Sequence, residues 1–338
     1  MELTSPEITV SLPYSHFYDD LAARLTPEEE SQVRLVHWTF KNGAPQGAEP
    51  GDIDLVVLPF HTIAMKTTEQ YVSTHVLKSA LATATRARLA QAPSIGIEGL
   101  EPCIPDGVVL SNAVGVMEQP TAELAVTLLL AIRREIPGFL ESGPEWNNHR
   151  TAGLIGSRVL LLGYGGVGAN VARMLSGFDV DIVRVARRAR DLPTGEHVHG
   201  VDELAELLST ADAVVCTLPL TTATAGLVDA DMLARLRDGA TFVNVGQGAV
   251  VDTDALLAEA ERGRLMIALD VTEPEPLPED HPLWRLPNVL ITPHVGGNSN
   301  ASHRFQADLL VEQVRRVLAD QTPRNIVHGE WSSLQAQS

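Results

Sequence analysis

Cysteine is scarce in this sequence of 338 residues, and the two that are present, Cys103 and Cys216, lie far apart. Their scarcity excludes a disulfide scaffold and a CxxC metal or redox motif. Positive charge is also in short supply, because 25 Lys and Arg face 43 Asp and Glu and give a formal net charge of −18. Since chains that bind nucleic acid along their length are usually basic, we expect no nucleic-acid partner.

Long apolar runs are missing as well. The longest one within a helical pattern, residues 124–132, is too short to span a bilayer. The first residues form neither a basic n-region nor an apolar h-region, so we expect a cytoplasmic protein without a membrane partner. With 44% hydrophobic and 20% charged residues the composition is that of a globular protein, and the length suggests two or three domains.

The clearest organisation runs from about residue 153 to residue 297, where strand and helix patterns alternate. The strand patterns are continuous apolar runs, as expected for strands buried on both faces of a parallel sheet. The expected strands and helices are residues 158–162, 167–175, 181–186, 201–208, 213–218, 229–236, 241–245, 253–261, 265–271 and 289–292. This alternation predicts a doubly wound α/β domain of the Rossmann type.

The first 110 residues alternate less regularly and predict a second, smaller α/β domain. The expected strands here are residues 8–12, 33–38 and 55–58, and the expected helices are 16–25 and 69–81. Residues 121–134 predict a long helix with Thr121 as its N-cap. Because this helix is apolar nearly all round, we expect it to be buried between domains or subunits. Residues 301–319 predict another helix, whereas residues 141–152 are polar, contain Gly and Pro, and predict a loose connection.

A glycine-rich loop carries the first functional signal. The residues Gly163, Tyr164, Gly165, Gly166, Val167 and Gly168 form a GxGxxG motif. The motif follows an apolar strand directly and opens a helix, which is the context that a dinucleotide site requires. Glycines let the backbone approach a pyrophosphate, and the helix N-terminus offers free N–H groups and the positive end of a dipole. A tight glycine turn without a ligand is the alternative.

The end of the next expected strand bears on the choice of cofactor. A dinucleotide fold usually places Asp or Glu there to bind the ribose 2′-hydroxyl, but this sequence has Ala186. Arg187, Arg188 and Arg190 follow at once. A carboxylate repels a 2′-phosphate, whereas guanidinium groups bind it in bidentate fashion. The sequence therefore favours NADP over NAD, the alternative being that these arginines lie in a solvated surface turn.

Three segments further along the chain carry a family resemblance. They are residues 268–276 (ALDVTEPEP), 286–289 (LPNV) and 291–297 (ITPHVGG). Together with the glycine motif, the segment from Pro219 to Thr224 and residues 244–252, they resemble the D-isomer-specific 2-hydroxyacid dehydrogenase family. The resemblance spans roughly residues 92–297, and the first 90 residues agree only in the general order of strands and helices.

The resemblance implies a split architecture. Residues 1–112 and 298–338 would form a smaller, flavodoxin-like α/β substrate domain, and residues 113–297 the dinucleotide-binding domain inserted into it. It also implies NADP or NAD as the cofactor and a small 2-keto or 2-hydroxy acid as the substrate. Members of the family are usually homodimers built around the helix that corresponds to residues 121–134.

By the same resemblance, His294 is the acid/base that protonates the ketone oxygen while hydride arrives from the nicotinamide. Glu275 is its partner, because a nearby negative charge raises the pKa of an imidazole. The chemistry requires such a pair, namely a group that titrates near neutrality and a carboxylate that tunes it. Asp270 is similar to the residue that hydrogen-bonds the nicotinamide carboxamide, although a strand-end Asp that caps a turn is the alternative.

The resemblance also implies further contacts to the cofactor and to the substrate. The remaining cofactor positions are Pro219, Thr224, Val245 and Gly297. Ser94, Ile95 and Gly96 are similar to the family loop whose backbone N–H groups bind the substrate carboxylate, where a glycine permits close approach. A plain turn is the alternative for this segment.

Gln247 is a departure from the family pattern. Where the family has Asn-x-Ala/Ser-Arg-Gly, this chain has Asn244-Val245-Gly246-Gln247-Gly248. The missing arginine is the one that pairs with the substrate carboxylate and polarises the ketone. A neutral glutamine weakens both effects. Three explanations stay open: a substrate other than an ordinary 2-keto acid, a slow or redirected protein, or a deliberate Arg→Gln substitution.

The sequence thus predicts an oxidoreductase that transfers hydride between NAD(P)H and a small 2-keto or D-2-hydroxy acid, or a close analogue. The alternative is a weakly active or inactive dinucleotide-sensing protein that resembles a corepressor. The retained pair of His294 and Glu275 argues against this alternative, and the lost arginine argues for it.

One histidine pair could suggest a metal. His197 and His199 flank Val198 and could share an ion, but no third ligand is spaced for it in the sequence. A strand edge is the favoured interpretation, and we expect no metal site.

Overall fold

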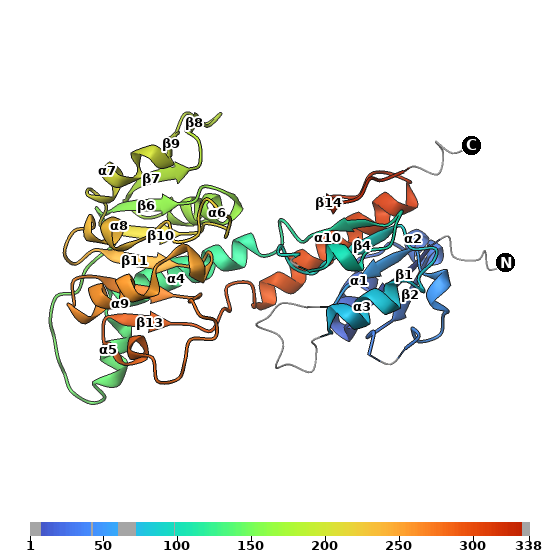
Figure 1. Ribbon diagram of the computed structural model, residues 1–338, viewed down its shortest axis with the longest axis horizontal. Coiled ribbons are helices and arrows are strands. Elements are labelled where there is room, and N and C mark those ends of the chain that lie inside the picture. The colour runs from blue at the N-terminus through green and yellow to red at the C-terminus, as the bar shows by residue number, and fades with distance from the viewer. Residues whose placement is uncertain (1–7, 42, 60–71, 98, 333–338) are drawn as a thin grey trace. The chain divides into compact units, whose positions relative to one another are not determined.

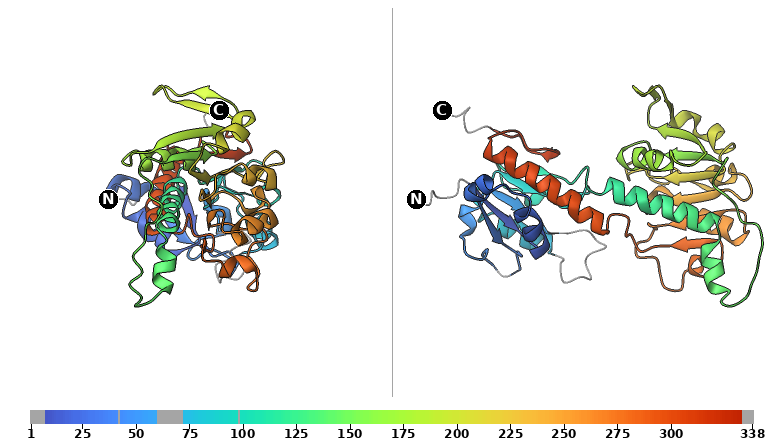
Figure 2. Two further views of the ribbon diagram at one scale, coloured as in Figure 1. Left: turned by 90° about the vertical axis from the view of Figure 1, so that its left-hand side faces the viewer. Right: turned by 180° about the vertical axis from the view of Figure 1, so that it is seen from behind.

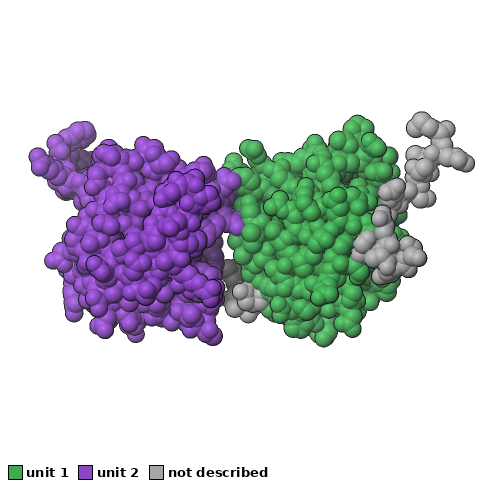
Figure 3. All heavy atoms as spheres, turned by 90° about the horizontal axis from the view of Figure 1, so that it is seen from above, with its two compact units in different colours: residues 1–117, 299–338 green, residues 118–298 purple. Residues whose placement is uncertain are grey.

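The computed structural model describes residues 8–41, 43–59, 72–97 and 99–332. The chain forms two compact units, residues 1–117 with 299–338 (unit 1) and residues 118–298 (unit 2), which Figure 3 distinguishes by colour. The unit boundaries thus fall at residues 118 and 298, whereas the sequence placed them at 113 and 297. Residues 69–71, the expected start of one helix, lie outside the described residues. Among the described residues, no helix has the length and apolar character to cross a bilayer.

Unit 1 contains a sheet of six strands. They are β1 (Ile8–Leu12), β2 (Val33–His37), β3 (Leu55–Val57), β4 (Leu89–Gln91), β5 (Val109–Ser111) and β14 (Ile326–His328). Five of them are parallel in the order β2-β1-β3-β4-β5, and β14 pairs with β5 in the antiparallel sense. This is the flavodoxin-like order, so the fold predicted for the smaller domain is confirmed.

Helices cover both faces of this sheet. On one face, α1 (Ser15–Ala22) and α10 (Asn300–Leu318) pack on side chains such as Val10 and Leu55. On the other, α3 (Thr74–Leu81) packs on side chains such as Val56. The alternation of Leu55 and Val56 between the two cores follows from the period of two in a strand. Figure 2 (right) shows α10 lying along its sheet. The other helical segments among the described residues of unit 1 are α2 (Pro27–Gln32), η1 (Pro50–Asp52) and η3 (Glu101–Cys103).

Unit 2 contains a sheet of eight strands. They are β6 (Arg158–Leu162), β7 (Asp181–Ala186), β8 (Arg190–Asp191), β9 (His197–Gly200), β10 (Ala213–Cys216), β11 (Thr241–Asn244), β12 (Met266–Leu269) and β13 (Val289–Ile291). Their spatial order is β13-β12-β11-β10-β6-β7-β9-β8, and only β8 is antiparallel to its neighbour. The order reverses between β6 and β10, which is the Rossmann switch point where ligands bind beyond the carboxyl ends of the strands.

Two layers of helices cover this sheet (Figure 1). The long α4 (Glu118–Arg133) and α6 (Gly166–Leu175) pack on the face that carries Val159 and Leu161. The opposite face carries Leu160 and Leu162 and is covered by shorter helices. These are α7 (Leu204–Leu208), α8 (Ala230–Ala234) and α9 (Thr253–Glu261), with the 3₁₀ turns η4 (Val201–Glu203), η5 (Gly248–Val250) and η6 (Pro282–Arg285) alongside.

The long helix differs from its prediction at both ends. It begins at Glu118, so Thr121 is a first-turn residue and not the N-cap. Pro120 is compatible with this start because the first turn of a helix leaves its N–H groups unpaired anyway. After α4 the chain forms α5 (Ile136–Glu141), which the sequence did not predict. Strands β4, β5, β8 and β14 were also not predicted. Each has only two or three residues, and a run this short is weak evidence for a strand.

Candidate functional site

The glycine loop connects β6 to α6 in unit 2, at the carboxyl edge of the sheet. Gly163 has φ +108°, a conformation that side chains rarely adopt, and its carbonyl accepts a 2.7 Å hydrogen bond from Thr217. A Cβ at Gly168 would lie 2.1 Å from the Gly163 carbonyl oxygen, so only glycine lets the helix pack this closely on the strand. The first N–H groups of α6 have no partner within the helix and are available to a phosphate. The loop therefore fits the pyrophosphate of a dinucleotide.

The arginines that follow β7 lie beside this loop. Ala186 is the last residue of β7, and Arg187 and Arg188 after it are exposed. The guanidinium of Arg190 donates a 3.0 Å hydrogen bond to the backbone carbonyl of Tyr164. Arg190 thus ties the strand end to the glycine loop, while Arg187 and Arg188 present their charge to solvent.

Asp270, at the end of β12, anchors the segment that carries His294. Its carboxylate is buried, with 2% of the residue exposed, and accepts hydrogen bonds from the Thr292 hydroxyl at 2.6 Å and the backbone N–H of Val295 and Gly296. Its backbone carbonyl accepts from the N–H of His294 at 2.8 Å. A carboxylate offers about four acceptor sites, so three donors leave one for a ligand amide. Asp270 thus caps the turn that carries His294, which is the alternative that the sequence left open for this residue.

His294 and Glu275 form a hydrogen-bonded pair of titratable side chains at the carboxyl edge of the sheet in unit 2. Nδ1 of His294 lies 2.6 Å from Oε1 of Glu275, and the two side chains are 40% and 31% exposed. The hydrogen bond to the Glu275 carboxylate raises the pKa of His294, partial burial opposes this, and the negative charges of Glu275 and Asp270 add to the rise. With Nδ1 bound to the carboxylate, Nε2 is the nitrogen that can exchange a proton with a ligand.

His294 also has a strained backbone. Its φ is +53°, in the left-handed region that few non-glycine residues occupy. The hydrogen bond from its own N–H to Asp270 fixes this conformation. Strain of this kind persists where the surroundings over-determine a residue, and such residues concentrate at active sites.

Gln247 lies on the neighbouring loop, after β11. The loop backbone is fixed by the buried Asn244, whose amide donates to the Gln247 carbonyl at 3.1 Å and accepts from the Gly246 N–H at 3.1 Å. A Cβ at Gly248 would lie 1.9 Å from the Thr272 carbonyl oxygen, so glycine is required there. The Gln247 side chain is exposed and takes no part in these contacts.

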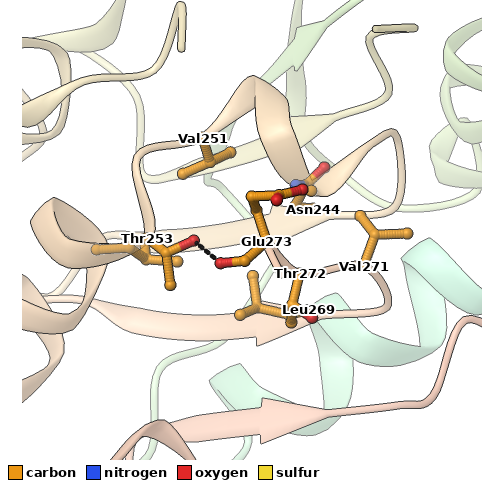
Figure 4. A pocket seen from close by; sticks show the side chains of 9 residues that line it. Asn244, Val251, Thr253, Leu269, Val271, Thr272 and Glu273 are labelled. Carbon is orange, nitrogen blue, oxygen red and sulfur yellow. Dashed lines mark hydrogen bonds between the residues drawn. The ribbon is translucent and has the colours of Figure 1, made fainter. Parts of the chain in front are cut away.

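Behind this loop lies a cavity of about 10 Å³, lined by residues that include Asn244, Gly248 and Glu273. Figure 4 shows it from close by, with the Thr253 hydroxyl donating to the Glu273 carbonyl. Its volume suffices for about one water molecule. The cavity therefore belongs to the packing of the loop and not to a binding site for a substrate.

The other expected cofactor positions also lie at this edge, on loops after β10, β11 and β13. Thr224 closes its own loop by donating to the Pro219 carbonyl at 2.6 Å. Val245 is 5% exposed and its N–H donates to the Cys216 carbonyl, so only its carbonyl could reach a ligand. Gly297 lies in the turn that follows His294. Tyr164 and Val167 pack against the core beneath α6.

The expected carboxylate loop lies in unit 1, after β4. The Ser94 hydroxyl donates to the Gly96 carbonyl at 2.8 Å, and the Asn112 amide donates to the Ile95 carbonyl at 3.1 Å. These bonds hold the loop through its carbonyls. Within the described part of the chain, no group accepts a hydrogen bond from the N–H of Ile95 or Gly96. Both amides therefore remain available to an anion.

Comparison with known proteins adds an independent finding. Residues 126–296 match the family model described as "D-isomer specific 2-hydroxyacid dehydrogenase, NAD binding domain". This stretch contains the glycine loop, Asp270, Glu275 and His294.

Individual relatives agree with the family match. The human glyoxylate reductase/hydroxypyruvate reductase is 32% identical over 260 residues, which cover 73% of this chain and 78% of that protein. The glyoxylate/hydroxypyruvate reductase B of Pectobacterium atrosepticum is 32% identical over 74% of this chain and 82% of its own. The D-isomer specific 2-hydroxyacid dehydrogenase of Xanthobacter autotrophicus Py2, crystallised with NADPH and MES, superposes with a TM-score of 0.74 at 28% identity, covering 96% of this chain and 98% of that one.

Proposed function

This chain belongs to the D-isomer-specific 2-hydroxyacid dehydrogenase family, an NAD(P)-dependent family of oxidoreductases, and we propose that it reduces a small 2-keto acid to the D-2-hydroxy acid. The observation that carries the proposal is the 2.6 Å contact between His294 and Glu275 at the edge that also holds the glycine loop. A protein that only senses a dinucleotide has no need of a proton donor with a raised pKa at this place.

In the proposed reaction each group has one task. The N–H groups of the glycine loop in unit 2 would hold the dinucleotide, and the chemistry that this cofactor would supply is hydride transfer to the keto carbon. His294, held by Glu275 and Asp270, donates its Nε2 proton to the ketone oxygen as negative charge develops there. In unit 1, the substrate domain of the proposal, the N–H groups of Ile95 and Gly96 bind the carboxylate.

The choice of substrates to test follows from the relatives. Reductases of glyoxylate and hydroxypyruvate are among the proteins most similar to this chain, so both acids, with pyruvate and a bulkier 2-keto acid, make a discriminating panel. We expect NADPH oxidation with at least one of them, followed as steady-state loss of absorbance. A protein that binds NADPH but turns over none of the panel would be the dinucleotide-sensing alternative.

We expect a preference for NADPH over NADH, because Ala186 offers no carboxylate and the exposed Arg187 and Arg188 face solvent beside the loop. A charge-assisted hydrogen bond contributes about 1.5–3 kcal/mol, so the double variant Arg187→Ala/Arg188→Ala should weaken NADPH binding by roughly tenfold or more. Binding of NADH, which lacks the 2′-phosphate, should change little. Fluorescence titration with both cofactors measures the two affinities.

The matched control is Arg235→Ala/Arg285→Ala, which removes two exposed arginines elsewhere on unit 2. It should leave both affinities unchanged. Equal or tighter binding of NADH by the unaltered protein, or an unaffected NADPH affinity in the double variant at 187 and 188, would contradict the assignment.

We further propose that the protein is a homodimer and that the segment after α4 forms part of the interface. Three large apolar side chains are strongly exposed there, namely Leu140 at 78%, Trp146 at 95% and Ile155 at 76%. Apolar side chains gathered in one segment mark an interaction surface more often than isolated ones do.

The two free, buried cysteines suit a reducing compartment, which we take to be the cytoplasm.

Placing a charge in this segment should disrupt the dimer. For Leu140→Asp/Trp146→Asp we expect sedimentation as a monomer at concentrations where the unaltered chain sediments as a dimer, because each carboxylate would have to be buried without a partner. Val76→Asp, at an exposed apolar residue of α3, is the control and should remain dimeric. A monomeric unaltered chain would refute the proposal.

A further inference from the structure

Two histidines and two carboxylates converge on β9, and none of them is a residue assigned above to the cofactor or the substrate. One ring nitrogen each of His197 and His199 and a carboxylate oxygen of Glu203 all lie within 4.8 Å of one another. Nδ1 of His199 is 2.8 Å from Oε2 of Glu203, and Nδ1 of His197 is 2.7 Å from Oδ1 of Asp191. The third ligand that sequence spacing did not reveal is thus Glu203, brought back by the turn η4 that follows β9.

Strand register separates the charges around this cluster. In the antiparallel pair of β8 and β9, Asp191 lies opposite His197 and Arg190 lies opposite Val198. Directly opposed residues project to the same face of a sheet. Asp191 therefore shares the face of the two histidines, whereas Arg190 lies on the other face. On the parallel neighbour β7, Arg184 is likewise in register with Val198. The histidine face therefore carries Asp191, while Arg184 and Arg190 lie on the opposite face.

The side chains of His197, His199 and Glu203 are held in place by the fold but remain accessible to solvent. Val198 between the histidines is fully buried, which fixes β9 and points both imidazoles to one side. The other oxygen of Glu203 accepts a 3.1 Å hydrogen bond from the Gly200 N–H, which holds this carboxylate beside His199. The side chains of His197, His199 and Glu203 are 48%, 28% and 43% exposed, so an ion can enter and the rings can rotate.

We propose that His197, His199 and Glu203 form a binding site for a divalent transition-metal ion, Zn²⁺ in the first place. Imidazole nitrogens and a carboxylate oxygen are ligands that Zn²⁺ accepts at about 2.0–2.2 Å, which places neighbouring ligand atoms about 3.3 Å apart in a tetrahedron. Rotation of partly exposed side chains closes the observed spacing to that value. Asp191 is the carboxylate that orients His197, as carboxylates beside metal-bound histidines commonly do.

The donor set also selects the kind of ion. Two imidazoles favour Zn²⁺, Co²⁺ and their neighbours over Mg²⁺ and Ca²⁺, which prefer oxygen ligands alone. Its residues are distinct from those of the proposed dehydrogenase chemistry, because none of them belongs to the glycine loop or forms a hydrogen bond with His294 or Glu275.

The test uses the full chain without a polyhistidine tag, stripped of metal with a chelator. Zn²⁺ binding is measured by calorimetry and Co²⁺ binding by its visible absorption, which reports nitrogen and oxygen ligation. We expect roughly one equivalent of either ion to bind, and His197→Ala, His199→Ala and Glu203→Gln each to weaken binding by about tenfold or more. Asp191→Asn should weaken it less, because it removes only an orienting group. His328→Ala, at an exposed histidine of β14, is the control and should bind like the unaltered chain.

Two results would overturn the proposal. One is the absence of both a calorimetric signal and Co²⁺ absorption in the unaltered chain. The other is equal affinity in the double variant His197→Ala/His199→Ala, which would place the ion elsewhere. Melting curves recorded with chelator present show whether each variant is folded, and Glu203→Gln, which keeps the bond to Gly200 possible, still tests the site if a histidine variant unfolds.

Discussion

Replacing His294 with alanine is expected to lower kcat for keto-acid reduction by roughly 10²–10⁴-fold, the range over which a positioned general acid acts. The affinity for NADPH should change little, because the glycine loop and the arginines after β7 are separate from this side chain. The fall should therefore appear in kcat and in kcat/KM together, which is the pattern of a group that acts in the transition state. Steady-state kinetics combined with NADPH titration separates the two effects.

The pH dependence tests Glu275 as the residue that positions and tunes His294. The hydrogen bond to Glu275 raises the pKa of His294, so the imidazolium persists to higher pH than in a free histidine. Reduction consumes the proton of the imidazolium, so its rate falls as pH rises through this pKa. In Glu275→Gln the negative charge is gone and the pKa falls, so the loss of rate should occur at lower pH. Oxidation of the hydroxy acid needs the neutral ring, and its rising limb should move in the same direction.

A neighbouring carboxylate provides the control. Glu273 is exposed two residues before Glu275, and Glu273→Gln removes the same charge without touching His294. Its pH profile should match that of the unaltered protein. A profile that stays in place in Glu275→Gln, or a kcat that survives in His294→Ala, would remove the pair from the mechanism.

Several strands were predictable from the sequence, and β1, β6 and β7 have the bounds that it predicts. β6 shows the physical reason, because a strand buried on both faces needs a continuous apolar segment, and its last four residues are all buried. The three-residue strands β4 and β5 escaped prediction. They are stable because they pair with neighbours on both sides, and this information does not lie within their own residues.

The site was predictable where motif and topology coincide. The glycine loop, Glu275 and His294 follow β6, β12 and β13, which are three strands of one parallel sheet, so they lie at the same edge of that sheet. The sequence left open whether Asp270 caps a turn or bonds a ligand, because the donors that it caps lie 22 to 26 residues further along the chain. The link from Arg190 to Tyr164 and the approach of Glu203 to the β9 histidines depend in the same way on folded loops.

Restoring the family's charge at position 247 is expected to raise kcat/KM for 2-keto acids by roughly ten- to a hundredfold or slightly more. This factor corresponds to one charge-assisted contact of about 1.5–3 kcal/mol. In Gln247→Arg, the guanidinium would pair with the carboxylate of the bound acid and would face the ketone oxygen as negative charge builds up there. The gain should therefore include kcat and not only KM.

The structure of the loop favours this outcome. The backbone around position 247 is held by the amide of Asn244 and by the close contact of Gly248 with Thr272, neither of which involves the Gln247 side chain. Because that side chain is exposed, an arginine can be accommodated without crowding the core. The substitution thus changes the charge offered to a ligand while the loop conformation is retained.

Three further variants separate charge from size and from general effects on the protein. Gln247→Lys supplies the charge without the fork of donors and should recover only part of the gain, since a guanidinium binds a carboxylate in bidentate fashion. Gln247→Met has similar volume and no charge, and it should show no gain. Gln321→Arg, at an exposed glutamine in unit 1, adds the same charge elsewhere and should behave like the unaltered protein.

Measurements with glyoxylate, pyruvate and a bulkier 2-keto acid decide between two interpretations. A gain in Gln247→Arg on any of these acids means that the glutamine weakens a site that otherwise retains the family's chemistry. If none of them reacts faster, the pocket has adapted to glutamine and Gln247 does not weaken the site.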